Sequence, residues 1–191
     1  MPRRTVLVAG VAVVAVVAIA ALIWAIRATP RWRSSTRAVA APSPTAPAPP
    51  GRKIKARLFY VSEDGTRLTS IEREIAYGDG PLEQAREIIA AQIAPVAEPF
   101  VSAIPPGTTI RALFMTEGGD AYVDFSREIT SGHTGGTADE LLTIYTIVNA
   151  LTENLPGVTG VQLLVDGKEV DTLAGHIDLR NPLTKNVGLV Q

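Results

Sequence analysis

An uncharged run of 22 residues near the amino terminus is the strongest constraint on this chain. Residues Thr5 to Ile26 read TVLVAGVAVVAVVAIAALIWAI. A helix of that length, at ~1.5 Å per residue, spans the ~30 Å hydrocarbon core of a bilayer. The apolar region of a cleaved signal peptide is shorter, about 7–15 residues, and the cleavage-like Ala38-Val39-Ala40 lies well past the run. We therefore predict a retained transmembrane helix at residues 5–26, after a short tail of residues 1–4.

The residues after this helix, 27–51, are predicted to form a spacer. Four arginines are spread over residues 27–37. Residues 38–50 read AVAAPSPTAPAPP, in which five residues are proline and none is charged. Such a composition favours polyproline II, which at ~3.1 Å per residue gives a stalk about 40 Å long. Arg3 and Arg4 flank the other end of the apolar run. The positive-inside rule, counted literally on these arginines, therefore puts the following domain in the cytoplasm.

Charge separates the two parts of the chain. Residues 52–191 carry 19 acidic and 12 basic side chains, a net charge of −7. Nucleic-acid binding is driven by cationic contacts to phosphate, so we exclude it. The absence of cysteine excludes disulfides, cysteine-ligated metals and a cysteine nucleophile.

Residues 52–184 are predicted to form one α+β domain. Alternating apolar residues mark five strands, and apolar residues at helical spacing mark two amphipathic helices. The second helix begins at Thr137-Ala138-Asp139-Glu140, which has the sequence of a capping box. We predict a two-layer fold with one sheet and two helices, in the order β-β-α-β-β-α-β. The strands are expected at residues 52–61, 67–77, 108–115, 121–125 and 158–165, and the helices at 81–96 and 137–155.

The segment Leu173–Leu183 is predicted to dock on the domain. Its apolar residues recur among polar ones and would otherwise stand exposed. His176 and Asp178 lie within it, so we expect the histidine to be buried beside a carboxylate, in a structural role. Residues 185–191 are expected to be a mobile end.

Five short motifs resemble the GerMN domain of bacterial sporulation and spore-germination proteins. They are AIPPGT (103–108), VDFS (123–126), IVNALTENLPGV (147–158), VQLLVDGKEV (161–170) and TLAGHIDLRNPL (172–183). The resemblance covers residues 54–182. It implies an envelope-anchored, extracytoplasmic module that assembles with partners, in some cases near cell-wall amidases, and it carries no catalytic residues. This implied location is our reason to place the domain outside the membrane, against the arginine count.

His133 is the first candidate for chemistry. It lies in the loop SGHTGG (131–136), before a helix whose amino-terminal N–H groups suit an anion. The loop lacks the GK[ST] sequence of a phosphate-binding P-loop. Ser126, His133 and Asp139 include the residue types of a catalytic triad, but no G-x-S-x-G elbow supports one. We predict a loop that leads into a capped helix.

Three carboxylates, Glu117, Asp120 and Asp124, raise the possibility of glycosidase chemistry. That chemistry needs two carboxylates about 5–9.5 Å apart across a cleft. We expect a solvated hairpin instead, with Asp120 in the turn and Asp124 on the polar face. Asp166-Gly167 is expected to be a turn, and Asn149 to bond nearby backbone. The sequence therefore predicts no catalytic, cofactor-binding or metal-binding residue.

Two classes of function remain open. A glycan binder needs an aromatic platform or a polar cleft, and residues 52–191 contain no tryptophan and eight Phe and Tyr residues. We therefore predict a non-enzymatic, single-pass protein of the cytoplasmic membrane. Its extracytoplasmic domain is expected to bind an envelope protein or to self-assemble, in cell-wall remodelling or in a sporulation- or germination-type process. The alternative is a peptidoglycan-binding or peptidoglycan-cleaving domain.

Overall fold

The computed structural model describes residues 51–191, which belong to a single unit. The predicted transmembrane helix at residues 5–26, the tail before it and most of the spacer lie outside the described residues. Within residues 51–191, no helix combines the length and the apolar character needed to cross a bilayer.

The seven expected elements occur in the expected order. Three short elements, α3, β6 and η1, are additional. The elements are β1 (Lys53–Val61), β2 (Leu68–Ala76), α2 (Pro81–Ile93), β3 (Ile110–Met115), β4 (Asp120–Phe125), α3 (Glu128–Ser131), α4 (Thr137–Asn154), β5 (Gly160–Val165), β6 (Lys168–Glu169) and η1 (Val187–Leu189).

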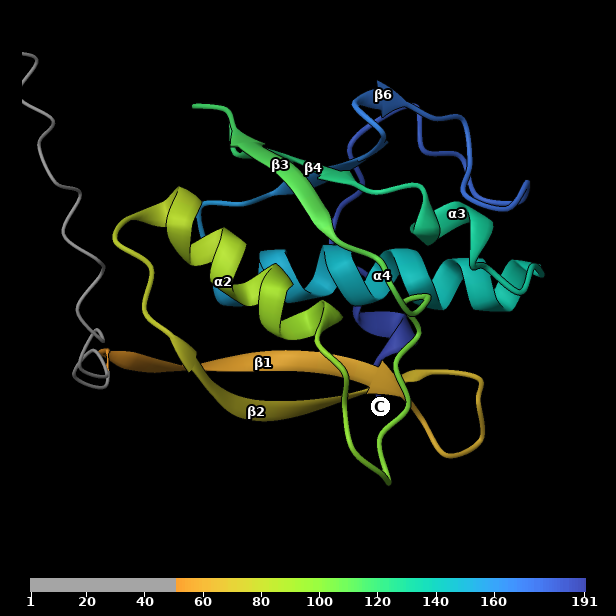
Figure 1. Ribbon diagram of the computed structural model, residues 1–191, viewed down its shortest axis with the longest axis horizontal. Helices are drawn as coiled ribbons and strands as arrows, with labels where there is room; N and C mark the ends of the chain where they lie inside the picture. The colour runs from red at the N-terminus through yellow and green to blue at the C-terminus, as the bar shows by residue number, and fades with distance from the viewer. Residues whose placement is uncertain (1–50) are drawn as a thin grey trace, which may run out of the picture. The chain divides into compact units, whose positions relative to one another are not determined.

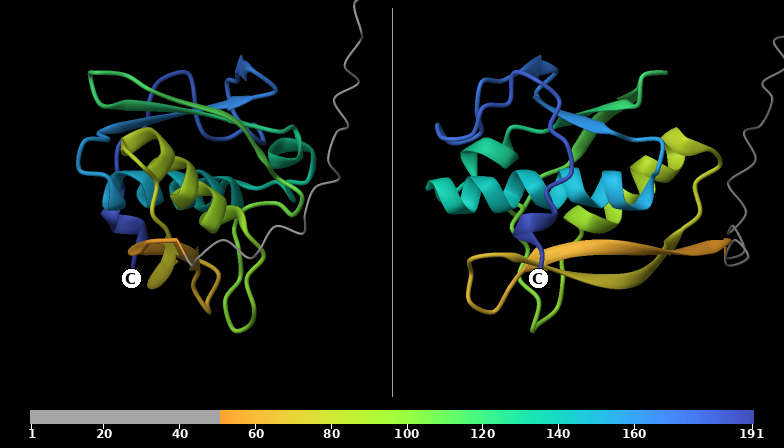
Figure 2. Two further views of the ribbon diagram at one scale, coloured as in Figure 1. Left: turned by 60° about the vertical axis from the view of Figure 1, so that its left-hand side comes forward. Right: turned by 180° about the vertical axis from the view of Figure 1, so that it is seen from behind.

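The prediction of one sheet and two layers is wrong, because the strands form two sheets. β1 and β2 make an antiparallel pair, and the other strands form a four-stranded sheet in the order β3-β4-β5-β6, in which β4 and β5 run parallel. Helices α2 and α4 lie between the two sheets (Figure 1) and contact both of them. The views in Figure 2 show the same three layers from two other sides.

The physical reason for three layers is visible in α4. Ten of its 18 residues are buried, so the helix is covered around most of its circumference. An amphipathic helix on one sheet needs a narrower apolar stripe, with its polar side in water. The breadth of the buried surface of α4 therefore matches a helix covered on two sides.

Side-chain amides close the free edge of β1. Gln92 accepts the N–H of Phe59 at 2.9 Å and donates to its carbonyl at 2.7 Å. Asn154 makes the same pair of bonds with the backbone of Arg57, both at 2.8 Å. The two helices thus supply the hydrogen bonds that a neighbouring strand would make, and this ties both of them to the two-stranded sheet.

The carboxyl-terminal segment packs against the domain, as expected for residues 173–183. Leu179 is buried, and Leu183 pairs with Val161 on β5. Residues 185–191, which we expected to be a mobile end, also have partners. The N–H of Gln191 donates to the carbonyl of Leu68 at 3.0 Å, and the chain terminus lies beside the two-stranded sheet (Figure 1).

Candidate functional site

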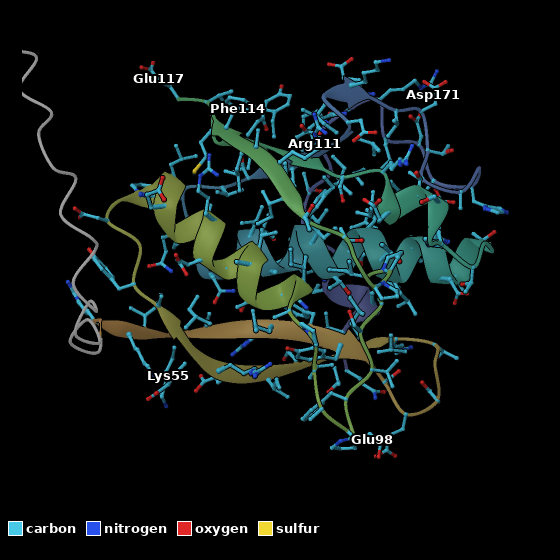
Figure 3. All side chains as sticks on the ribbon, viewed as in Figure 1. Lys55, Glu98, Arg111, Phe114, Glu117 and Asp171 are labelled. Carbon is cyan, nitrogen blue, oxygen red and sulfur yellow. The ribbon has the colours of Figure 1, made fainter. Side chains whose placement is uncertain are left out.

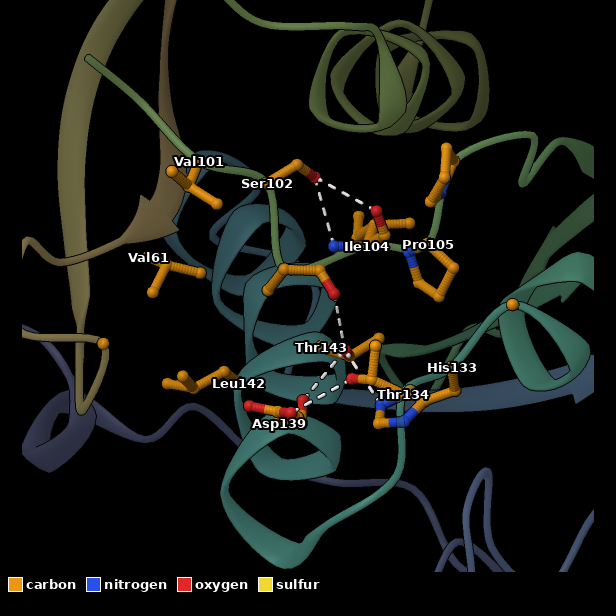
Figure 4. A pocket seen from close by; sticks show the side chains of 14 residues that line it. Val61, Val101, Ser102, Ile104, Pro105, His133, Thr134, Asp139, Leu142 and Thr143 are labelled. Carbon is orange, nitrogen blue, oxygen red and sulfur yellow. Dashed lines mark hydrogen bonds between the residues drawn. The ribbon is translucent and has the colours of Figure 1, made fainter. Parts of the chain in front are cut away.

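A pocket of about 320 Å³ opens between the loop that follows α2 and the amino-terminal end of α4. Its walls include the apolar side chains of Val61, Ile104 and Leu142. Its polar side holds His133 and Thr143, which point toward each other (Figure 4). Of the residues suggested for chemistry, His133 and Asp139 line this pocket.

Both ring nitrogens of His133 have partners. Nδ1 accepts the N–H of Gly135 at 3.0 Å, which places the proton of the neutral ring on Nε2. Nε2 lies 3.3 Å from Oγ1 of Thr143, and that hydroxyl lies 2.6 Å from the carbonyl of Ala103. The ring therefore joins its loop to α4 and, through Thr143, to the loop after α2, and neither nitrogen is free to act as a base.

The suggested triad is not assembled. Ser126 accepts the N–H of Thr109 at 3.1 Å, and its hydroxyl lowers the pKa of Glu128 through a hydrogen bond. Asp139 accepts a bond from the hydroxyl of Thr134 at 3.1 Å. Within residues 51–191, no hydrogen bond joins any two of Ser126, His133 and Asp139.

The predicted capping box is wrong. α4 begins after Gly136, and no side chain caps its first turn. Glu140, the residue expected to close the box, is instead buried and faces the carboxyl-terminal segment. Its carboxylate accepts the N–H groups of Leu173 at 2.8 Å, Ala174 at 2.9 Å and His176 at 2.8 Å.

The electrostatics of Glu140 follow from this arrangement. Burial raises the pKa of its carboxyl, but the N–H donors of Ala174, His176 and Leu173 together with the His176 ring outweigh that effect, and the pKa is lowered overall. The His176 ring contributes through Nδ1, 3.1 Å from the carboxylate. Glu140 therefore stays ionised while buried, and it holds the carboxyl-terminal segment as an anion bound by backbone donors.

His176 does lie beside a carboxylate, although the partner is Glu140 and not Asp178. Its side chain is 39% exposed, so the expectation of a buried ring is wrong. Asp178 binds Arg180 instead, at 2.6 Å, and the Arg180 guanidinium holds the pKa of the Asp178 carboxyl well below its usual range.

Asp124 is buried, so the expectation of a solvated hairpin is wrong at this residue. Its carboxylate binds Nε of Arg111 at 3.2 Å and accepts the N–H of Gly167 at 2.8 Å. Asp120 is the first residue of β4 and not part of the turn, whereas Glu117 is exposed in the hairpin connection. Through these bonds, Asp124 links β3 to the turn between β5 and β6.

The remaining two predictions concern Asp166 and Asn149. Asp166 and Gly167 connect β5 to β6 with φ values of 50° and 75°, so the predicted turn is confirmed. Asn149 bonds backbone, also as expected, but the partner is 37 residues away. Its side chain accepts the N–H of Asn186 at 3.0 Å and donates to its carbonyl at 3.1 Å.

Sequence reasoning missed Glu140, Gln92 and Asn154 as residues that join segments distant in the chain. The available signal was a polar residue within the apolar spacing of a helix: Gln92 follows Ala85 and Ile88 on the buried side of α2. Within the described part of the chain, no group of three His, Asp or Glu residues is placed to hold a metal ion.

The fold and these contacts define a small module in which two sheets enclose two helices and buried polar side chains hold loops and the carboxyl-terminal segment in place. Residues 57–171 match the Germane family, described as "Sporulation and spore germination". This match spans more than half of the 191 residues, and the chain belongs to that family.

Solved structures share the fold. A Clostridium perfringens protein described as a candidate lipoprotein matches with a TM-score of 0.50 at 22% identity, over 71% of this chain and 89% of that one. The tandem GerMN domains of the sporulation protein GerM from Bacillus subtilis match with a TM-score of 0.52 at 17% identity, over 70% of this chain and 46% of theirs. The first GerMN domain of GerM alone gives 0.50 at 16% identity, over 69% and 97%. No curated protein sequence matches the chain.

Proposed function

We propose that this protein is a membrane-tethered module of the bacterial envelope, whose extracytoplasmic domain binds other envelope proteins and performs no catalysis. The observation that carries the proposal is that the side chains suggested for catalysis already have hydrogen-bond partners within the domain. His133 bonds through both ring nitrogens, Asp124 is bound by Arg111 and a backbone N–H, and Glu140 holds the carboxyl-terminal segment. General acid–base catalysis needs a group that is free to reach the proton of a substrate.

The tether in this proposal is the run Thr5–Ile26, joined to the domain by the spacer 27–51. Membership of a family described by sporulation and spore germination supports a role in such processes or in related cell-wall remodelling. Similarity to a candidate lipoprotein supports a place at the envelope. The net charge of −7 on residues 52–191 favours protein partners with basic surfaces over nucleic acid.

Incubation with purified cell walls tests the absence of catalysis. The full-length protein, in detergent, is mixed with peptidoglycan sacculi, and soluble fragments are separated by chromatography, with a muramidase as positive control. We expect no release above that of a heat-denatured sample. Release that is lost in Asp120→Asn, Asp124→Asn or His176→Ala would contradict the proposal and support the peptidoglycan-cleaving alternative.

A further inference from the structure

The pocket beside the amino-terminal end of α4 has apolar side chains both on its floor and at its rim. Leu142 and Ile104 are buried on the floor, whereas Val101 at the rim is 59% exposed. The volume of about 320 Å³ is at the lower end of the range for ligand sites, about 300–1,000 Å³. The pocket therefore suits one or two side chains and is too small for a helix.

Asp139 supplies the charge of this pocket. Among the described residues that line it, Asp139 is the one carboxylate, and none is lysine or arginine. Its Oδ2 accepts a bond from the hydroxyl of Thr134 at 3.1 Å. Within residues 51–191, no N–H or hydroxyl donates to Oδ1, and no cationic side chain pairs with the carboxylate. Figure 4 shows the carboxylate on the side of the pocket that Thr134 and Leu142 also line, so one oxygen is available to a ligand.

The charges in and around the pocket favour a cation over an anion. The first turn of a helix attracts negative charge, but Asp139 already lies in the first turn of α4 and supplies it. An anionic ligand would meet this carboxylate, with no lysine or arginine in the wall to bind it. The connection between β1 and β2, which contributes Gly65 to the wall, also carries two exposed carboxylates, Glu63 and Asp64, and one arginine, Arg67. The rim thus adds net negative charge.

We propose that this pocket binds a lysine side chain of a partner protein, with its ammonium group on Oδ1 of Asp139 and its aliphatic part against the apolar wall. A lysine stem packs on apolar surface while its charged end keeps a polar partner. Arginine fits less well, because its fork binds both oxygens of a carboxylate and Thr134 already donates to Oδ2. An apolar residue next to the lysine contacts Val101. The inference rests on the proposed function, because it gives the protein-binding domain one site and one kind of partner side chain.

A random twelve-residue peptide library displayed on phage is the probe. It is selected on the full-length protein in lipid nanodiscs, after subtraction on empty nanodiscs. We expect enriched peptides in which a lysine lies beside an apolar residue. In synthetic copies of one such peptide, the lysine is replaced by arginine or by norleucine, which keeps the stem without the charge. Both replacements are expected to weaken binding about threefold to tenfold, and added salt should weaken the lysine peptide more than the norleucine peptide.

Variants of the protein test whether the peptide occupies the pocket. Asp139→Asn is expected to weaken the lysine peptide about threefold to tenfold and to leave the norleucine peptide unchanged. The matched control is Asp171→Asn, on an exposed carboxylate after β6 and outside the pocket (Figure 3), and it should change neither. Val101→Lys is expected to weaken the lysine peptide about tenfold or more, because it puts a like charge at the rim. Val187→Lys, on a valine that is also exposed, should leave binding unchanged.

Several results would overturn the inference. Selected peptides without lysine, failure to enrich any peptide, or equal binding of the lysine and norleucine peptides would each do so. Self-association of the full-length protein that is lost in Asp139→Asn would show that the occupant is a second copy. Thermal stabilisation by inorganic phosphate would show an anion site. Peptides that bind equally well to Asp139→Asn and Val101→Lys would exclude this pocket and leave the proposed binding of envelope proteins standing.

Discussion

Replacing Glu140 tests the claim that one buried carboxylate holds the carboxyl-terminal segment. Glu140→Ala removes the acceptor of three backbone N–H groups and of the His176 ring. Each buried donor left without a partner costs about 1–3 kcal/mol. Leu173 is buried, whereas Ala174 and His176 are close enough to the surface for water to replace part of the loss. We therefore expect the free energy of unfolding to fall by about 2–4 kcal/mol.

Glu140→Gln separates charge from shape. It keeps one oxygen for two donors, but it turns an NH₂ group toward the others, and we expect a loss of about 1–2 kcal/mol. The assay is urea unfolding followed by circular dichroism, with Glu117→Gln, on an exposed residue of the hairpin, as the matched control. A second comparison repeats Glu140→Gln in a chain that lacks residues 172–191. There the substitution is expected to have almost no effect, because the donors are gone.

The pH dependence has a defined sign. The folded-state pKa of Glu140 is lowered from its ordinary value of 4.5, so its contribution is fully present above that pH and is lost as the pH falls through the folded-state pKa. The difference in stability between the wild-type protein and Glu140→Gln should therefore shrink under acid. Equal stabilities of Glu140→Gln and Glu117→Gln at pH 7 would show that the Glu140 carboxylate does not hold the carboxyl-terminal segment.

Other substitutions test other contacts. Deletion of residues 172–191 should lower the melting temperature by several degrees or more. Burying Leu179 alone contributes about 1.5–3 kcal/mol, and ~1 kcal/mol shifts the melting temperature of a domain of this size by roughly 2–8 °C. Unchanged thermal unfolding would mean that the segment contributes no stability. Gln92→Leu should cost about 1–3 kcal/mol in urea unfolding, because it leaves the backbone of Phe59 unpaired, and a neutral result would show that β1 needs no cover at this residue. Asn149→Ala should release residues 185–191, measured as faster hydrogen exchange of the Asn186 amide; unchanged exchange would contradict the role of that side chain.

The order of elements was predictable because periodicity is a local property. Alternation in residues 52–61 and helical spacing in 137–155 report which face of an element is buried. The number of sheets was not predictable in this way, because the pairing of two hairpins is decided by contacts distant in the chain. The breadth of the apolar surface of α4 was the one local sign of a second sheet.

The role of Glu140 shows the same limit more sharply. Its position in Thr137-Ala138-Asp139-Glu140 fits a capping box, and that motif is judged on four residues. In the structure, the Glu140 carboxylate instead accepts backbone N–H groups more than thirty residues away. These donors belong to the carboxyl-terminal segment, whose docking was itself only predicted from the sequence. The same holds for Asp124. Alternation predicts that it lies on the polar face, but it is buried and bound to Arg111 and to the N–H of Gly167.

The location of residues 52–191 relative to the membrane decides whether this domain is an extracytoplasmic module. In the full-length chain, alkaline phosphatase, which is active only outside the cytoplasm, is fused after Gln191, and a cytoplasmic β-galactosidase reporter is fused at the same residue in a parallel chain. We expect an active phosphatase and a silent β-galactosidase, despite the arginines at residues 27–37. A silent phosphatase with an active β-galactosidase would contradict this expectation, and would place the domain where the literal arginine count puts it.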